Sequence, residues 1–383
     1  MRIEKITLRH IRMPLLHPFR TSFGEEQVRG PIIVAVQGEG LTGYGETPVS
    51  FAPDYSYETV QTAWHIQRDF LIPRLLGQDI ERPEQVGELL APVRGHPMAK
   101  MGLEAAIWDL LAKAEGRSLS QMLGGTRTRI PCGVSIGIQP SLPALLERIG
   151  GFLAQGYRRI KLKIEPGWEL AVVKAVRDEF GDVPLMLDAN AAFTLDDVPL
   201  FQALDEYDLM MIEQPLGHDD LYEHSLLQRQ IKTPICLDES IRHLSDARAA
   251  IEWESCRIIN IKAGRMGGLV EARRVHDLCQ QRGLPVWCGG LLESGIGRAH
   301  NVALASLPNF RLPGDISASD RYFQEDIVDP PFVLNSDGTM TVPAGAGIGV
   351  DVKTDLLQRL TVEEATFLAY THCVSSVNKR GTF

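Results

Sequence analysis

The sequence lacks the features that would place it in a membrane or a secretory pathway. It has no run of about 18 consecutive apolar residues, so we expect no helical membrane span. The N-terminal segment alternates polar and apolar residues and contains no apolar signal-peptide core. The cysteines form no C-x-x-C pair, which predicts reduced and mostly buried thiols in a cytoplasmic protein. They are Cys132, Cys236, Cys256, Cys279, Cys288 and Cys373.

Basic clusters and two common enzyme motifs are also missing. Lys and Arg number 39 against 49 Asp and Glu, which gives a net charge of −10 and no basic run. Phosphate contacts need clustered Lys and Arg, so a nucleic-acid partner is not expected. No H-x-H motif of the amidohydrolase-type barrels occurs, and no G-x-G-x-x-G follows the first expected strand of a dinucleotide-binding sheet. With 44% hydrophobic and 23% charged residues, the composition is that of a globular protein.

The first third of the chain changes from a strand pattern to a helix pattern. Residues 2–49 alternate and are interrupted by glycines, which predicts a β-meander. Residues 56–124 predict helices, the clearest of them over 99–115 with Gly116 as its stop. An apolar stripe is expected on one face of that helix. Strands followed by helices predict an α+β capping domain over residues 1–125.

From Pro131 onward the chain repeats one unit. Eight short apolar runs occur, each followed by a stretch able to form a helix. The charged residues at the run ends are 25, 25, 25 and 24 residues apart, from Lys163 through Asp188, Glu213 and Asp238 to Lys262. Equal strand–helix units predict a (β/α)8 barrel over residues 126–320, in the α/β class. A doubly wound sheet would not readily give eight equal repeats.

The remaining segment, residues 321–383, is expected to return to the capping domain. It contains the helix-like stretch 352–360 and the glycine-rich stretch 345–350. The glycine-rich stretch resembles a phosphate loop only superficially, because no βαβ pattern surrounds it. We therefore predict a turn there.

Two lysines near the end of the second run share one strand face. Lys161 and Lys163 are two residues apart, whereas Ile160, Leu162 and Ile164 occupy the opposite face. The isoleucines and leucine should pack under the helices, so the lysines should point into the barrel mouth. The alternative, two solvated lysines on an edge strand, is disfavoured because a closed barrel has no edge.

Three acids end the next three runs at the same depth. Asp188, Glu213 and Asp238 would repel one another in one buried volume unless a positive charge lay between them. Oxygen ligands without His or Cys select a hard cation, so we expect Mg²⁺, with Mn²⁺ or another divalent cation able to substitute. The alternative is that each acid caps the next helix.

Lys262 ends the sixth run, opposite Lys163 in an eight-stranded ring. Two lysines facing each other across a cation predict removal of a proton α to a carboxylate, with one lysine taking the proton and the other returning it. Burial, a second ammonium group and the cation are expected to lower the pKa of these lysines.

Three polar residues near these run ends are expected to support the site. Glu239 should point away from the cation and bond to Lys262 or a neighbouring strand end, because it follows Asp238 directly. Asn190 and Asn260 are either hydrogen-bond donors to the site or ordinary loop residues.

Short segments at the run ends identify a family resemblance. KLKI (161–164), LDAN (187–190), IEQP (212–215), LDES (237–240) and NIKAG (260–264) resemble the enolase superfamily, muconate-cycloisomerase-like subgroup. The resemblance covers essentially the whole chain and implies a (β/α)8 barrel with an α+β capping domain. HPFRTSFG (17–24), GGLLESGIGRAHN (289–301) and GDISASDRYF (314–323) are similar to the o-succinylbenzoate synthase / N-acylamino acid racemase family.

The resemblance implies two reactions of small carboxylates. One is dehydration of 2-succinyl-6-hydroxy-2,4-cyclohexadiene-1-carboxylate to o-succinylbenzoate, in menaquinone biosynthesis. There the strand-two lysine would remove the proton and return it to the leaving hydroxide, while Lys262 would stabilise the enediolate. The other is racemisation of N-succinylamino acids, in which both lysines would act. A homo-oligomer, dimer or octamer, is also implied.

The same resemblance suggests substrate-binding residues. Racemising members tend to carry an Arg three residues after the strand-six lysine, and Arg265 stands there, with a solvated loop Arg as the alternative. Ala263 replaces the usual proline of that segment. The other expected pocket residues are Phe19, Phe23, Phe51 and Tyr55 as an apolar wall, Ser135 on strand one, and Gly289 and Gly290, whose missing side chains let a backbone N–H approach the acyl carboxylate.

Other members of the superfamily remain as alternatives. A muconate cycloisomerase shares every lysine and acid, so only loops separate it. A dipeptide epimerase is disfavoured because run eight lacks Asp-x-Asp, and a sugar-acid dehydratase because run seven ends without His. A catalytically silent scaffold should have lost one of these groups, and none is lost.

Overall fold

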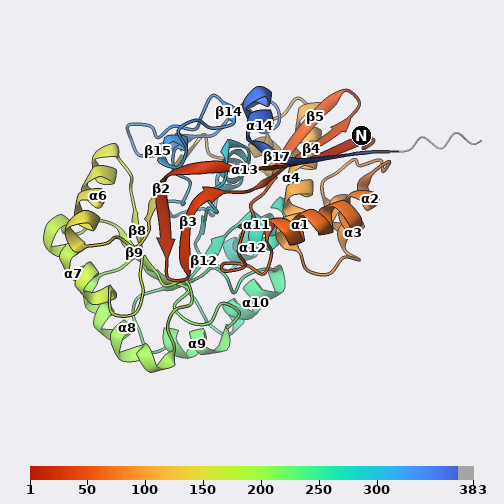
Figure 1. The fold of residues 1–383 in the computed structure, drawn as a ribbon. Coiled ribbons are helices and arrows are strands. Elements are labelled where there is room, and N and C mark those ends of the chain that lie inside the picture. Colours follow the sequence, from red (N-terminus) through yellow and green to blue (C-terminus); the bar gives the residue numbers. More distant parts are fainter. Residues whose placement is uncertain (370–383) are drawn as a thin grey trace, which may run out of the picture.

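The computed structural model describes residues 1–369 and consists of a barrel with a capping domain against one side of its mouth (Figure 1). Cys373 lies outside the described residues. None of the helices within residues 1–369 combines the length and the hydrophobicity of a membrane span.

The capping sheet differs from the predicted meander in its strand order. Its order is β17-β1-β4-β5, formed by Thr361–Leu368, Lys5–Ile11, Ile32–Gly38 and Leu41–Thr47. The intervening strands β2 (Met13–Thr21) and β3 (Gly24–Arg29) leave this sheet as a separate hairpin that reaches over the barrel (Figure 1). β1 therefore pairs with β4 instead of β2, and β17 from the C-terminal segment covers its other edge.

The capping helices follow the sheet. They are α1 (Val60–Ile66), the π-helical η1 (Gln67–Leu71), α2 (Ile72–Leu75), α3 (Glu84–Leu90), α4 (Pro97–Ala114) and α5 (Leu119–Leu123). The predicted helix 99–115 is α4, but its single apolar stripe is wrong, because α4 is buried on nearly every face between the capping sheet and barrel helices α11 and α12. A Cβ at Gly43 or Gly45 of β5 would come within 2.0 Å or 2.2 Å of an α4 carbonyl oxygen, so this close packing requires glycine.

Within the described residues the barrel has seven regular parallel strands and one irregular closing segment. The strands are β7 (Val134–Ile136), β8 (Ile160–Lys163), β9 (Leu185–Asp188), β10 (Met211–Glu213), β11 (Ile235–Leu237), β12 (Ile258–Ile261) and β13 (Val286–Cys288). The eighth predicted run, 310–316, joins β13 to β7 through Asp315 N–H to Cys288 O (2.9 Å) and Gly133 N–H to Gly314 O (2.8 Å). Pro313 in that run has no N–H to donate, which is consistent with the absence of a regular strand there.

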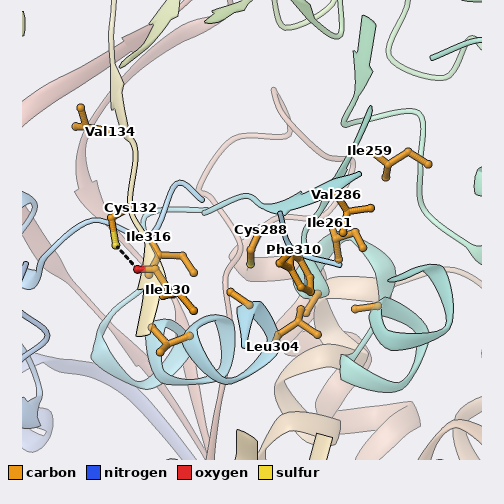
Figure 2. Packing of buried hydrophobic residues seen from close by; sticks show 14 of the residues in the cluster. Ile130, Cys132, Val134, Ile259, Ile261, Val286, Cys288, Leu304, Phe310 and Ile316 are labelled. Atoms are coloured by element: carbon orange, nitrogen blue, oxygen red, sulfur yellow. Dashed lines mark hydrogen bonds between the residues drawn. The ribbon is translucent and has the colours of Figure 1, made fainter. Parts of the chain in front are cut away.

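Helices cover the barrel and complete each repeat. They are α6 (Leu142–Gln155), α7 (Glu169–Phe180), η2 (Leu195–Asp197), α8 (Val198–Leu204), η3 (Asp205–Tyr207), α9 (Tyr222–Gln228), α10 (Leu244–Glu252), α11 (Ala263–Met266), α12 (Leu269–Gln281) and α13 (Gly295–Ala305). Figure 2 shows Ile261, Cys288, Phe310 and Leu304 packed between the strands and the surrounding helices. Inside the barrel, Met186, Met211, Cys236, Ile258 and Trp287 form a second buried cluster.

The C-terminal segment returns along the side of the molecule that the capping domain occupies. Its elements are η4 (Ser319–Arg321), β14 (Val328–Asp329), β15 (Thr339–Thr341), which pairs with β6 (Arg129–Pro131), β16 (Asp351–Val352), α14 (Thr354–Leu360) and β17. The glycine-rich stretch 345–350 forms a turn, as predicted, and Ile348 N–H donates to Asp109 of α4 at 2.8 Å.

Buried glutamates of the capping domain cap two barrel helices. Glu104 accepts hydrogen bonds from Leu269 N–H (2.5 Å) and Val270 N–H (3.1 Å), at the start of α12. Glu46 does the same for α13, where it accepts from Ser294 N–H at 3.2 Å and Gly297 N–H at 3.0 Å. Burial raises the pKa of both carboxyls to about 7. These caps join the two domains through helix N-termini, whose N–H groups favour the ionised carboxylate but only partly offset the effect of burial.

Glu104→Gln should give a pH-dependent stability difference from the unmodified protein. The folded pKa of about 7 exceeds the ordinary 4.5, so the stability that the protonated carboxyl contributes is full below pH 4.5 and is lost as the pH rises through 7. Glutamine cannot ionise, so the variant lacks this pH dependence. Between pH 4.5 and 8 the free energy of unfolding of the unmodified protein should therefore fall by about 3 kcal/mol relative to that of the variant, as measured by urea unfolding. Glu179→Gln, on the exposed face of α7, is the control, and a Glu104→Gln difference that does not change with pH would contradict the assignment.

Candidate active site

The register of the barrel sheet sets charged residues at one level. Lys163 at the end of β8 is paired with Asp188 of β9, and Asp188 is paired with Glu213 of β10. Asp238 follows β11 directly and Lys262 follows β12 directly. The carboxyl ends of parallel strands meet at one edge, so all five side chains reach the barrel mouth, where barrel enzymes have their active sites.

Ammonium groups lie between the carboxylates on one side of the mouth. Lys161 Nζ is 2.8 Å from Asp188 Oδ2, 2.5 Å from Glu213 Oε2 and 3.0 Å from Asp315 Oδ2. Lys163 Nζ donates to Asp188 Oδ2 and to Asn190 Oδ1, both at 2.6 Å. Both lysines therefore share one strand face, as the alternation predicts, and both are buried.

The third lysine lies at the other end of this row of acids. Lys262 Nζ donates to Asp238 Oδ2 at 2.7 Å and to the hydroxyl of Tyr55 at 3.0 Å. Strands β9, β10 and β11, which carry the three acids, separate β8 from β12. Lys163 and Lys262 thus flank the carboxylates from two sides.

A cavity of about 310 Å³ lies between this mouth and the capping domain. The β2–β3 hairpin and residues 48–58, here called the capping loop, contribute its outer wall. The predicted residues that line it are Lys161, Lys163, Lys262, Phe19, Phe23, Phe51, Tyr55, Ser135, Asn190 and Gly290. The structure therefore brings the charged groups and most of the expected pocket residues to one space.

Charge interactions between protein groups outweigh burial at Asp188, Lys161 and Lys262. Burial raises the pKa of Asp188, but the nearby ammonium groups of Lys161 and Lys163 outweigh it and hold the pKa well below its usual range. Burial likewise lowers the pKa of Lys262, yet the charge of Asp238 outweighs it and the pKa of Lys262 is raised; that of Lys161 is raised in the same way. These directions describe the protein groups alone; the lowering expected for the facing lysines includes the charge of the cation and stays a prediction.

Glu239 also lies differently from the prediction. Strand β11 ends at Leu237 and the chain turns at Asp238, so the alternation that would direct Glu239 away from the site no longer applies. Of its two expected partners, Lys262 or a strand end, Glu239 has the second: its carboxylate accepts a hydrogen bond at 2.9 Å from Nδ2 of Asn190, two residues past the end of β9. Burial, with the charge of Asp238, raises the pKa of Glu239 to about 7.

Both asparagines hold site residues in place. Asn190 links Glu239 to Lys163, and its backbone N–H donates to Asp188 Oδ1 at 3.0 Å. Asn260 Nδ2 donates to Glu213 Oε1 at 2.7 Å. Each therefore orients a charged group of the strand-end set.

Two expected pocket residues do not line the cavity. Arg265 is buried, so the solvated alternative is wrong, and its guanidinium donates to Asp238 Oδ1, to Asn260 O (2.5 Å) and to Ile241 O (2.8 Å). At Gly289, a Cβ would come within 2.6 Å of Lys262 Cε and 2.3 Å of Asn260 Oδ1. Glycine at this position therefore makes room for Lys262 and Asn260.

Sequence reasoning missed two charged residues of the site. Asp315 ends the eighth run and bonds to Arg159 at 2.6 Å and Lys161 at 3.0 Å. Arg159 is two residues before Lys161, so the same strand alternation would have directed it inward. The ammonium group of Lys161 and the guanidinium group of Arg159 also lie over the ring of Trp287, at 4.9 Å and 5.0 Å from its centroid.

The donor chemistry of the three carboxylates fits a hard divalent cation. In the described part of the chain, no set of three His, Cys, Asp or Glu side chains is already arranged around one point, because Lys161 lies among them. Glu213 Oε2 is nevertheless buried and accepts no hydrogen bond of good geometry, and its one close contact is with Lys161.

Comparison with protein families covers both domains. The model described as "Mandelate racemase / muconate lactonizing enzyme, N-terminal domain" matches residues 3–124. The model described as "Enolase C-terminal domain-like" matches residues 144–356.

Relatives with two activities match nearly the full length. The chain is 53% identical over 360 residues to an o-succinylbenzoate synthase of Geobacillus kaustophilus, covering 94% of this chain and 96% of that protein. It is 50% identical over 362 residues to an N-succinylamino acid racemase of an Amycolatopsis species, covering 94% and 98%. An enolase-superfamily structure from Listeria innocua superposes with a TM-score of 0.93 at 44% identity, covering 97% of this chain and all of that one.

Proposed function

The chain belongs to the enolase superfamily and is an enzyme of its o-succinylbenzoate synthase / N-succinylamino acid racemase branch, and we propose that one site performs both reactions with Lys163 and Lys262 as its acid–base pair. Both reactions begin with removal of a proton α to a carboxylate. The fold of this enzyme is a (β/α)8 barrel with an α+β capping domain.

One observation carries the assignment of the residues. Lys163 and Lys262 line the same cavity from strands on either side of the three acid-bearing strands. A substrate whose carboxylate faces those acids would have its α-carbon between the two lysines. Proton transfer on both faces of that carbon is then geometrically available.

In racemisation each lysine acts on one face. Lys163, held by Asp188 and Asn190, takes the α-proton of one enantiomer, and Lys262 donates a proton to the opposite face. The reverse direction exchanges their roles.

In dehydration one lysine suffices. Lys163 removes the α-proton and delivers it to the leaving hydroxide, and the ammonium group of Lys262 stabilises the negative charge that develops on the substrate. Lys161 lines the same cavity and adds a second ammonium charge beside that of Lys262.

Asp188, Glu213 and Asp238 are proposed to hold Mg²⁺, for which Mn²⁺ or another divalent cation can substitute. When bound, the cation supplies positive charge to the substrate carboxylate as the α-proton leaves. The remaining cavity residues are proposed to bind a small carboxylate substrate: Phe19 and Phe23 as an apolar wall, and Ser135, Asn190 and Gly290 near the strand ends.

We further propose a cytoplasmic homo-oligomer, either a dimer or an octamer. The described cysteines are all buried free thiols, which suits a reducing compartment. On the outside of the barrel, Tyr222 and Trp253 form an edge-to-face pair and are 61% and 49% exposed. Such exposed aromatics support contact between copies.

Removal of one proposed ligand should weaken metal binding. Glu213→Gln keeps the size of the side chain but removes a charge, so Mg²⁺ affinity should fall at least about tenfold in titration calorimetry of chelator-treated protein. Activity should disappear in chelator and return with Mg²⁺ or Mn²⁺. Glu25→Gln removes the same charge from the cavity wall and should leave the affinity within about twofold. Full activity after exhaustive dialysis against chelator would refute the metal assignment.

The two lysines should be separable by isotope exchange. Starting from each pure enantiomer of an N-succinylamino acid in D₂O, Lys163→Ala should lose α-proton exchange from one enantiomer and Lys262→Ala from the other, by about 10²–10⁴-fold. Lys262→Arg keeps the charge but not the acid–base function, and should reduce racemisation more than dehydration. Persistent exchange from both enantiomers in either alanine variant would exclude the two-base assignment.

A further inference from the structure

The two lysines of the proposed acid–base pair are held by different parts of the protein. Lys163 donates to Asp188 and Asn190, which both belong to the barrel. Lys262 donates to Asp238 of the barrel and, at 3.0 Å, to the hydroxyl of Tyr55 in the capping loop. Its Nζ also lies 4.4 Å from the centroid of the Tyr55 ring.

The Tyr55 hydroxyl bridges Lys262 to its carboxylate. The hydroxyl accepts from Lys262 and donates to Asp238 Oδ1 at 3.0 Å, and it also accepts from Arg265 Nη1 at 3.3 Å. These contacts leave the ammonium group little freedom to rotate away from the cavity. Lys262 is therefore oriented by one barrel group and one capping-domain group.

The capping loop is itself fixed by the capping domain. At its end, Glu58 accepts from the Met98 and Ala99 N–H groups of α4, at 2.8 Å and 3.0 Å. At its start, Arg29 of the hairpin donates to Ser50 Oγ at 3.0 Å. The position of Tyr55 over the barrel mouth thus depends on α4 and the hairpin, whereas Lys163 depends on neither.

We propose that Tyr55 is a positioning residue for Lys262, and that the capping loop thereby controls one of the two proton transfers. This inference rests on the proposed function. Racemisation uses both lysines as acid and base, whereas dehydration needs proton transfer only from Lys163. Tyr55 therefore sets the ratio of racemisation to dehydration in this enzyme.

The test compares Tyr55→Phe with a matched tyrosine in the same loop. Tyr55→Phe keeps the ring and removes the hydroxyl. Tyr57 lies two residues further on, is 54% exposed and, within residues 1–369, makes no side-chain hydrogen bond, so Tyr57→Phe is the control. Lys262→Ala first identifies which enantiomer depends on Lys262 for α-proton exchange in D₂O.

Tyr55→Phe is expected to slow Lys262-dependent exchange by about 10- to 100-fold in kcat, because a hydrogen bond to a charged group is lost. Lys163-dependent exchange should stay within about threefold, and this internal reference also shows that the variant is folded. The ratio of racemisation to dehydration should also fall, but by a smaller factor than the Lys262-dependent exchange, because the Lys262 ammonium group also stabilises negative charge in dehydration. Tyr57→Phe should leave both exchange rates within about threefold.

Three results would overturn the inference while leaving the proposed function intact. Equal losses from both enantiomers would give Tyr55 a general structural role, and a change in KM alone would make it a wall contact. If saturating Mg²⁺ restored the rate of Tyr55→Phe, the hydroxyl would act by supporting Asp238 as a metal ligand and not by positioning Lys262. Failure of the unmodified enzyme to exchange either enantiomer would refute the proposed function itself, and the inference with it.

Discussion

Mutual repulsion of three buried carboxylates is the constraint on which the site depends. Asp188, Glu213 and Asp238 are completely buried, and lysines provide the opposing charge. Leaving buried charges unpaired would cost several kcal/mol each, so the acids and lysines stabilise one another only as a set. The parallel register brings this set to one edge of the sheet, and the same register creates the two-sided arrangement of Lys163 and Lys262.

The capping domain is attached to the barrel by buried carboxylates, and it encloses the cavity of the site. Its buried carboxylates, Glu46 and Glu104, meet the N-termini of α13 and α12, and so attach it to the barrel through neighbouring repeats. Its hairpin and capping loop enclose the cavity, where a lower dielectric strengthens each charge interaction. Through Tyr55 the same loop reaches Lys262, which connects the attachment of the domain to the geometry of the site.

Spacing and alternation predicted the features that depend on local pattern. Run ends 24–25 residues apart gave the barrel, and period-two alternation gave the shared face of Lys161 and Lys163. Glu239 was placed wrongly because alternation ends where the strand ends, which the sequence does not mark. The pairing of β17 with β1, separated by more than 350 residues, has no local signal. The raised pKa of Lys262 depends on a carboxylate at 2.7 Å, a distance available only from the fold.

The central claim is that the two lysines face one α-carbon from opposite sides of the acid cluster. A crystal structure of the enzyme with Mg²⁺ and a bound N-succinylamino acid tests it directly. We predict one ion on Asp188, Glu213 and Asp238, with the substrate carboxylate facing it. The α-carbon should lie about 3–3.5 Å from Lys163 Nζ on one face and a similar distance from Lys262 Nζ on the other. Both lysines on the same face, or an ion bound away from these three acids, would contradict the account.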